Sequence, residues 1–191
     1  ETAISALVKA DTGNNGTTDK KKKPAVGTVK TVGQIKYKVT GKNTVTVNKY
    51  AKKTITKVSI PATVKINGYT FKVTAIADSA FSGCSKLTKV TVGSNVKTIR
   101  NKAFYKCTEL KTVSGASNIT KIENNAFNGC KALKKLVLDS KSLQSIGNAA
   151  FKNCTALTSI TVSSTKLTKI GKEAFSGNKK LAAVTIKTSK L

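Results

Sequence analysis

The chain has 191 residues, of which 39% are hydrophobic and only 5% are aromatic, and it contains no Trp, Met or His. This length allows one domain with a core of Val, Ile, Leu, Ala and a few Phe. The 35 basic and 8 acidic residues give a formal net charge of +27. There is no run of about 18 apolar residues, so the sequence predicts no membrane-spanning helix.

The positive charge comes almost entirely from lysine, because Arg100 is the only arginine. Lysine is a hydrated point charge that lacks the bidentate geometry with which arginine recognises phosphates and guanines. The lysines are interpreted either as a solvated surface that keeps the protein soluble or as a field that attracts polyanions. Candidate polyanions are cell-wall polymers, sulfated or sialylated glycans and nucleic acid. Specific nucleic-acid binding is not expected, because neither stacking aromatics nor a helix-turn-helix accompanies the charge.

Residues 1–30 are predicted to form a flexible, Lys-rich linker. Residues 11–19 consist of turn-forming types, and residues 20–24 are four lysines followed by a proline. Such a segment buries too little apolar surface to offset the entropy of ordering it. The apolar residues 3–10 are too few and lack the charged start of a signal peptide. A chain that starts at Glu1 is expected to be a mature form or an excised fragment.

Residues 31–75 are predicted to form an N-terminal β-hairpin cap and a first, irregular repeat. Apolar residues such as Ile35 and Tyr37 alternate with polar ones, which is the period of a strand with one buried face. Further along, Asn67-Gly68 separates two alternating runs. This dipeptide favours a type I′ turn, which needs positive φ at both central residues.

A repeat of 23–24 residues occupies residues 76–191. Its clearest column is an Ala-Phe pair, in which the five Phe residues are separated by 23, 23, 24 and 24 positions. An Ile lies four positions before each Ala. Three positions after each Phe is a Cys, or Asn178 in the last copy, and three positions after that residue is a Leu. The Phe column is Phe81, Phe104, Phe127, Phe151 and Phe175; the next is Cys84, Cys107, Cys130, Cys154 and Asn178; the Leu column is Leu87, Leu110, Leu133, Leu157 and Leu181.

This frame predicts a solenoid. Stretches such as Leu87-x-x-Val90-x-Val92 direct alternate side chains inward as a short strand, and in-register stacking gives a parallel sheet with ~4.8 Å per repeat. The Phe is expected to fill a wider return that contains a short helical piece. No repeat buries its apolar face alone, so stability must come from stacking on neighbours.

The frame Ile-x-x-x-Ala-Phe-x-x-Cys-x-x-Leu-x-x-Val-x-Val resembles the BspA-like leucine-rich repeats, also called the Treponema pallidum type, over residues 58–191. The resemblance implies a leucine-rich-repeat solenoid of the right-handed β/α superhelix type, with short parallel strands and short helical or irregular returns. It implies bacterial cell-surface or secreted proteins with roles in adhesion, host binding or contact between bacteria, and it offers no catalytic residues. Gly115 departs from the apolar strand column and Asn178 from the Cys column, which predicts local loosening at both places.

The cysteines are expected to be buried structural thiols. Four Cys spaced by 23 or 24 residues form a ladder along one edge of a solenoid, whereas a tetrahedral metal site needs converging ligands. No cofactor and no metal are therefore predicted. A disulfide between neighbouring rungs stays open as the less favoured interpretation, because in-register side chains point the same way.

An enzyme is not expected. Without His, the usual general base and the Ser–His and Cys–His arrangements are missing. Acidic residues that occupy unrelated points of the repeat frame are Asp78, Glu109, Glu123, Asp139 and Glu173. A pair of carboxylates of the glycosidase kind stays open as a remote alternative.

The outward positions of the repeated strands are the candidate binding face. They form a flat strip of hydroxyls with two lysines and no aromatic ring for sugar stacking. The candidate residues are Lys89, Thr91, Thr112, Ser114, Lys135, Val137, Ser159, Thr161 and Thr185, with Ala183 beside them. Solenoids commonly bind partners on such a surface, and glycans or acidic protein loops would suit it. An ordinary solvated β face is the alternative interpretation.

Two functions remain open at this point. The first is a surface-exposed adhesion or recognition module for an unknown protein or glycan. The second is a cell-wall-associated spacer or scaffold held to anionic polymers by lysine charge, whose binding would collapse with salt. The last repeat stops before another Ala-Phe pair, so its apolar end is expected to be covered by residues outside this chain or by self-association with a second copy.

Overall fold

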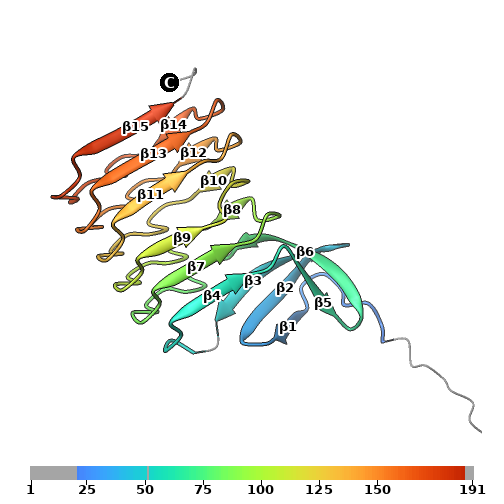
Figure 1. Ribbon diagram of the computed structural model, residues 1–191. Helices are drawn as coiled ribbons and strands as arrows, with labels where there is room; N and C mark the ends of the chain where they lie inside the picture. The colour runs from blue at the N-terminus through green and yellow to red at the C-terminus, as the bar shows by residue number, and fades with distance from the viewer. Residues whose placement is uncertain (1–20, 51, 188–191) are drawn as a thin grey trace, which may run out of the picture.

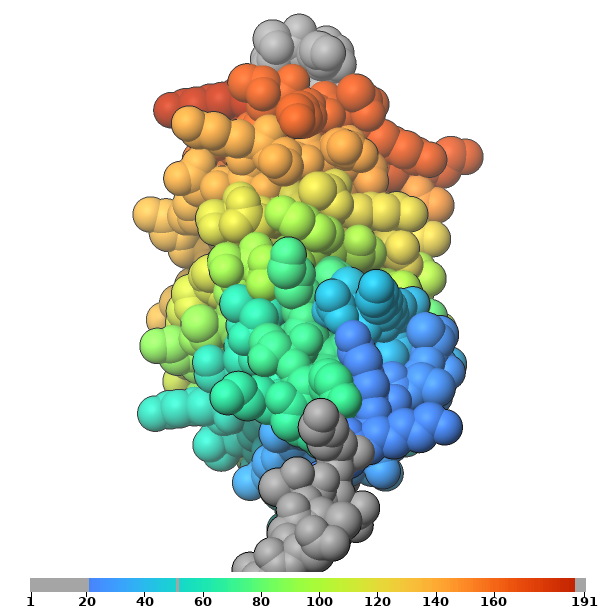
Figure 2. Space-filling model, turned by 90° about the vertical axis from the view of Figure 1, so that its right-hand side faces the viewer, coloured from blue at the N-terminus to red at the C-terminus, as the bar shows by residue number. Residues whose placement is uncertain are grey.

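The computed structural model describes residues 21–50 and 52–187, and within these ranges it contains strands and turns but no helix. The strands stack along one axis, so that each turn of the chain lies on the turn before it (Figure 1). From the side, residues that follow one another in sequence form successive layers from one end of the molecule to the other (Figure 2). The predicted solenoid is therefore confirmed, without the helical part of its returns.

One side of the stack is formed by six strands, which we call the front strands. They are β4 (Lys57–Ile60), β7 (Lys89–Val92), β9 (Thr112–Ser114), β11 (Lys135–Leu138), β13 (Ser159–Ser163) and β15 (Ala183–Lys187). They pair in parallel and in register as two separate three-stranded sheets, β4-β7-β9 and β11-β13-β15. No hydrogen-bonded pairing joins β9 to β11.

The other side is a continuous nine-stranded sheet, which we call the back sheet. Its repeated part consists of β6 (Tyr69–Ile76), β8 (Thr98–Ile99), β10 (Lys121–Ile122), β12 (Ser145–Ile146) and β14 (Lys169–Ile170). These strands pair in parallel, and the inward column of Ile76, Ile99, Ile122 and Ile146 is buried. Each turn thus contributes one front strand and one short back strand.

The back sheet continues past β6 into an antiparallel meander of β1 (Val29–Val32), β2 (Ile35–Gly41) and β3 (Thr44–Tyr50). Strand β3 pairs in parallel with β6, and β6 forms an antiparallel hairpin with β5 (Thr63–Ile66). The prediction of a β-hairpin cap needs correction here. The hairpin around Asn67 and Gly68, both at positive φ, exists, but β6 is itself a member of the repeated sheet.

The boundary of the predicted linker also differs from the structure. Residues 1–20 lie outside the described residues. The chain from residue 21 onward is tied to the sheet, because the amide of Gly27 donates to Val39 and β1 begins at Val29, before the expected boundary at residue 30. The proposed three-part division of the chain otherwise stays a prediction.

The return segments, residues 77–88, 100–111, 123–134, 147–158 and 171–182, contain turns in place of the expected short helices. In the second of them, alternate amides donate to the following turn, from Lys102 to Asn124 and from Phe104 to Ala126. The amides between them close three-residue turns, as from Ala103 to Arg100. An α-helix needs every amide for its own i−4 carbonyl, so this alternation excludes one.

Positive φ at residues such as Lys102 reinforces the exclusion, because the left-handed conformation interrupts any helical run.

The core of the stack is a column of parallel rings. Phe81, Phe104, Phe127 and Phe151 are buried and stack with centroids 5.1–5.2 Å apart. Tyr50 continues the column at the N-terminal end, with its ring centroid 5.7 Å from that of Phe81. The β meander therefore supplies a ring where no further repeat precedes the first Phe.

A second column runs beside the rings. The thiols of Cys107, Cys130 and Cys154 each donate to the carbonyl oxygen of the Phe in the preceding repeat frame, at 3.2–3.3 Å. Asn178 makes the same bond with its Nδ2, at 3.0 Å from the oxygen of Phe151. The predicted loosening at Asn178 is therefore wrong for the hydrogen bond, although its buried Oδ1 has no partner among the described residues.

Candidate functional site

The nine predicted site residues lie on the outer face of the front strands. Register places Lys89 beside Thr112 and Thr91 beside Ser114 in one sheet. In the other sheet three strands align position by position, giving the rows Lys135, Ser159, Ala183 and Val137, Thr161, Thr185. The inward residues between them, such as Val90, Leu136 and Ile160, are buried, so this face is fixed to the core.

The predicted face is not one continuous strip, because it divides between β9 and β11. Strand β9 ends at Ser114, and Gly115 follows at a φ of 79°. A Cβ on Gly115 would lie 2.2 Å from the carbonyl oxygen of Val92, so this backbone bends close against the preceding turn. The strand pairing of the front ladder ends at this position, which separates the candidate residues into two patches. The loosening expected at Gly115 stays a prediction.

A small hollow of about 160 Å³ marks the division. It is lined from one side by Val113 to Ser117 and from the other by Val137 and Asp139. Val137 is 48% exposed, which is high for a Val on a strand. Val137 is the one apolar side chain among the nine candidate residues, and it lies at this hollow.

Two residues of this face were missed by the sequence prediction. Lys57 and Ser59 of β4 pair in register with Lys89 and Thr91 and are exposed. The pattern Val58-Ser-Ile60 has the spacing of Val90-Thr-Val92, so the repeat frame itself contained the necessary information. The sequence prediction assigned this stretch to the first, irregular repeat but did not extend the candidate face to it.

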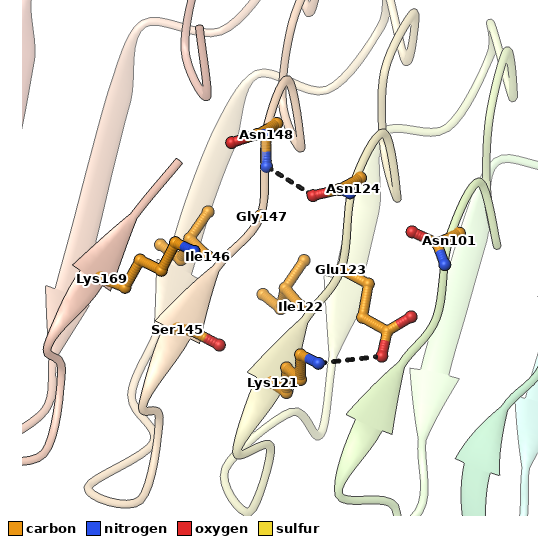
Figure 3. A pocket seen from close by; sticks show the side chains of 10 residues that line it. All are labelled: Asn101, Lys121, Ile122, Glu123, Asn124, Ser145, Ile146, Gly147, Asn148 and Lys169. Atoms are coloured by element: carbon orange, nitrogen blue, oxygen red, sulfur yellow. Dashed lines mark hydrogen bonds and ion pairs between the residues drawn. The ribbon is translucent and has the colours of Figure 1, made fainter. Parts of the chain in front are cut away.

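A hollow with a volume of about 570 Å³ lies on the opposite side, over β10, β12 and β14 (Figure 3). We call it the back groove. Its lining residues are Asn101, Lys121, Ile122, Glu123, Asn124, Ser145, Ile146, Gly147, Asn148 and Lys169. The sequence prediction placed none of its candidate site residues here, because the lining consists of common surface residue types and one glycine that resembled an ordinary turn residue.

The charge of the described residues is largely uncompensated. Three ion pairs occur there, Lys86–Glu109, Lys121–Glu123 and Lys152–Glu173. The hydrogen bond from Lys152 holds the pKa of the Glu173 carboxyl below its usual value, although that carboxyl is exposed. Most lysines, including Lys89 and Lys135 of the front face, have no carboxylate partner in these ranges, so a field that favours anions surrounds the stack.

The four cysteines are free and buried. Burial raises the pKa of the Cys107 and Cys154 thiols to about 12 and that of Cys130 well above its ordinary value. The pKa of Cys84 is also raised by burial, with Lys53 acting in the opposite direction. Such thiols are neither nucleophiles nor metal ligands at neutral pH, since both roles need the thiolate.

Residues 21–50 and 52–187 bring no three Asp, Glu, Cys or His side chains together in a way that would hold a metal ion. Within the same ranges no helix is both long enough and apolar enough to cross a bilayer. Of the carboxylates, Glu123 lies in the back groove, where it is paired with Lys121 at 3.3 Å. The structure thus places no second carboxylate beside it in the groove lining.

Parallel front strands, a parallel back sheet and turn-rich returns that repeat every 23–24 residues define a leucine-rich-repeat solenoid protein. Residues 74–190 match the BspA type leucine rich repeat region in six copies, and the chain belongs to this family. The resemblance recognised in the sequence is thereby confirmed.

Solved structures are similar to this chain over most of its length. The leucine rich repeat protein of T. pallidum is 30% identical, with a TM-score of 0.72, and the match covers 79% of this chain and 68% of that one. A leucine-rich repeat protein from Bacteroides ovatus is 32% identical, with a TM-score of 0.74 and coverage of 81% and 40%. The chain therefore spans less than half the length of this second protein.

A leucine rich cell surface protein from Faecalibacterium prausnitzii shares the fold, at 23% identity and a TM-score of 0.55, with coverage of 88% of this chain and 56% of that one. No curated protein matches the chain.

Proposed function

We propose that this chain is a non-enzymatic binding module of a bacterial cell-surface or secreted protein, and that its front face recognises a protein or glycan partner in adhesion. The observation that carries the proposal is the register of the front strands. Exposed lysines and half-buried or exposed hydroxyls stand in aligned rows on strands whose alternate side chains form the core. A rigid, preorganised surface of this kind loses little entropy on binding.

The proposed location is supported by the family and by its relatives. The F. prausnitzii protein of the same fold is described as a cell surface protein. The four free thiols do not oppose this location, because burial and a raised pKa protect them from oxidation.

A non-enzymatic role is supported by what the reactive groups do in the structure. The thiols donate to backbone carbonyls inside the stack, and the groove carboxylate is neutralised by its lysine neighbour. The remaining feature of the front face is its hollow beside Val137, which has the size to receive one apolar side chain of a protein partner. This hollow favours a protein partner over a glycan.

The proposal is tested by the binding of the purified chain to matrix proteins, glycans, wall polymer and DNA at low salt and at roughly threefold physiological salt. The double variant Lys89→Gln/Lys135→Gln is compared with Lys141→Gln/Lys166→Gln, which removes the same charge from exposed turns. Selective binding that survives high salt and is lost only in the front-face variant supports the proposal. Equal losses in both variants, or a ligand unaffected by either, contradict it.

The uncompensated lysine charge favours one alternative function, a spacer or scaffold associated with the cell wall through anionic polymers. In that case every polyanion in the panel binds in proportion to its charge density, and high salt removes all of them. Both double variants then lose affinity equally, because only the total charge matters.

A further inference from the structure

The back groove lies beside a column of the back sheet that changes from side chains to glycine. Gly147 and Gly171 occupy the repeat position held by Glu123 in the preceding turn. A Cβ on Gly147 would lie 2.6 Å from the amide nitrogen of Asn124, so the backbones of consecutive turns approach closely there. The hollow extends across several rungs, which are separated by ~4.8 Å each.

One wall of the groove carries amide donors of fixed orientation. The Oδ1 of Asn124 accepts from the backbone amide of Asn148 at 2.8 Å, and the Oδ1 of Asn148 accepts from that of Lys172 at 2.9 Å. A backbone amide can only donate, so each side-chain oxygen must face the stack. The two Nδ2 groups are thereby left as donors, and neither has a protein partner within the described residues.

The other wall carries cations in register. Parallel pairing aligns Lys121, Ser145 and Lys169 on adjacent strands, and Figure 3 shows the three side chains along the same edge of the groove. Lys121 is engaged by Glu123 at 3.3 Å, whereas no ion pair involves Lys169 within the described residues. The groove therefore offers one free ammonium, the two oriented amide donors, the amide of Asn101, a hydroxyl and a single carboxylate that is 19% exposed.

From this arrangement we infer that the back groove is a binding site for an acidic sugar, a pyranose that carries a carboxylate among free hydroxyls. The ligand carboxylate pairs with Lys169, its hydroxyl oxygens accept from the Asn124 and Asn148 amides, and a hydroxyl donates to Glu123. A simple inorganic anion lacks a donor for Glu123, and a neutral sugar leaves Lys169 unused. The site lies on the opposite side from the front face and goes beyond the proposed recognition of a partner there.

The affinity of one site should be low. No aromatic ring lines the groove, so the stacking that strengthens most sugar complexes is missing. We expect a millimolar dissociation constant for a short oligomer and an increase for a long polymer through repeated engagement. Lys121 and Lys169 are two rungs apart, ~10 Å along the stack, so an oligosaccharide can contact both ends of the groove.

The test uses the full chain and trigalacturonic acid, followed by chemical-shift changes in nitrogen-15 NMR spectra at physiological salt. We expect shifts centred on Asn124, Ser145 and Asn148, and binding weakened at least about tenfold when the sugar carboxylates are methyl-esterified. Lys169→Gln should cause a similar loss, and Lys141→Gln, which removes one exposed charge elsewhere, should leave the dissociation constant within about twofold. Equal binding of the ester, or equal loss in both variants, overturns the inference.

A second variant separates lost binding from lost folding. Ser145→Glu places a carboxylate in register between Lys121 and Lys169, where opposite charges on neighbouring strands attract. We expect an unchanged or higher thermal midpoint together with loss of trigalacturonic acid binding. Retained binding in this variant overturns the inference. The front-face variant Lys89→Gln/Lys135→Gln should bind the trimer normally, so that failure of the two proposals can be distinguished.

Discussion

The back sheet and the front strands are built from the same repeats, yet one is continuous and the other is interrupted. From β3 to β14 every neighbouring pair in the back sheet is hydrogen-bonded, whereas the front ladder stops between β9 and β11. The back strands are only two residues long in most turns, so length does not explain the difference. We infer that the strand pairing is continuous where each repeat turn supplies an apolar side chain that points inward.

The inward residues account for where the interruption falls. On the back sheet the inward position is Ile in each repeat, and the ring and thiol columns beside it run on without a gap from Phe81 to Phe151. On the front, Gly115 replaces the apolar residue that Val92 and Leu138 provide in the adjacent turns. The interruption of the front ladder thus falls at the turn that lacks this inward side chain, while the other columns keep the turns stacked.

The largest effect is expected from breaking the continuous part of the molecule. Phe127→Ala removes a fully buried ring from between two stacked neighbours and should lower the free energy of unfolding by ~3–5 kcal/mol. Phe175→Ala is the matched control, because that ring is half-buried and its stacking partner among the described residues is Phe151 alone. Urea denaturation followed by circular dichroism would measure the free energy of unfolding of both variants. Equal losses would contradict the interpretation that a ring is stabilised by stacking on a neighbour on each side.

The second prediction concerns pH and the thiol column. The folded-state pKa of Cys107 and Cys154 is raised to about 12, above the ordinary value of 9.0. The stabilisation from the protonated thiols is complete below pH 9 and is lost as the pH rises from about 9 towards 12, because the unfolded chain releases its protons first. Unfolding free energies across this range should therefore fall by a few kcal/mol.

The matched comparison for the pH effect is the double variant Cys107→Ala/Cys154→Ala. It is less stable at neutral pH but should show a shallower decline above pH 9, since fewer buried thiols titrate. A decline of the same slope in this variant would assign the alkaline loss to other groups.

The third prediction extends a column by one rung. Asn178→Cys keeps a donor for the carbonyl oxygen of Phe151 and removes the Oδ1 that is buried without a partner among the described residues. We expect stability to rise by ~1 kcal/mol, because a buried polar group without a partner costs about that much. Ser85→Cys, at an exposed turn without positive φ, controls for the new thiol. Lower stability in Asn178→Cys would show that the amide of Asn178 stabilises the end of the column more than a thiol does.

The smallest effect on stability is expected from a substitution at Gly115, where the front ladder is interrupted. Its effect should be confined to β9 and β11. Gly115→Val cannot keep its present conformation, since its Cβ would meet the Val92 oxygen at 2.2 Å. An extended backbone would instead place the new side chain inward beside Val92 and Leu138. Amide hydrogen exchange should then slow in β9 and β11, with a net stability change within ~1 kcal/mol. Unchanged exchange together with a large destabilisation would place the cause of the interruption elsewhere.

Much of the fold follows from the sequence because periodicity reports burial. The Phe, Cys, Leu and Ile columns predicted which side chains face inward, and the structure buries them in all the inner turns. The returns could not be predicted as turns. Their conformation depends on positive φ at non-glycine residues, and although Asn125 is of a type enriched there, Lys102 and Ala149 are ordinary helix formers.

The candidate sites divide in the same way. Strand alternation predicted the outward residues of the front face, but the candidate face was not extended to β4 in the first, irregular repeat. The back groove was not predictable from its polar residues, which are common surface types. Its lining includes Gly147, whose close approach to the turn below is a distance between backbones that no pattern of side chains encodes.

The hydrogen bonds between turns, from Phe81 to Ala103 and onward to Ala174, all run along the axis of the stack. Each turn is consequently held only by its two neighbours, and tension applied along that axis would detach the turns one at a time from an end. A detached turn of 23 residues extends to ~80 Å, many times the ~4.8 Å that it occupies in the stack. Under load along this axis we therefore expect stepwise mechanical unfolding, in which the molecule lengthens by one turn at a time while its remaining turns stay folded.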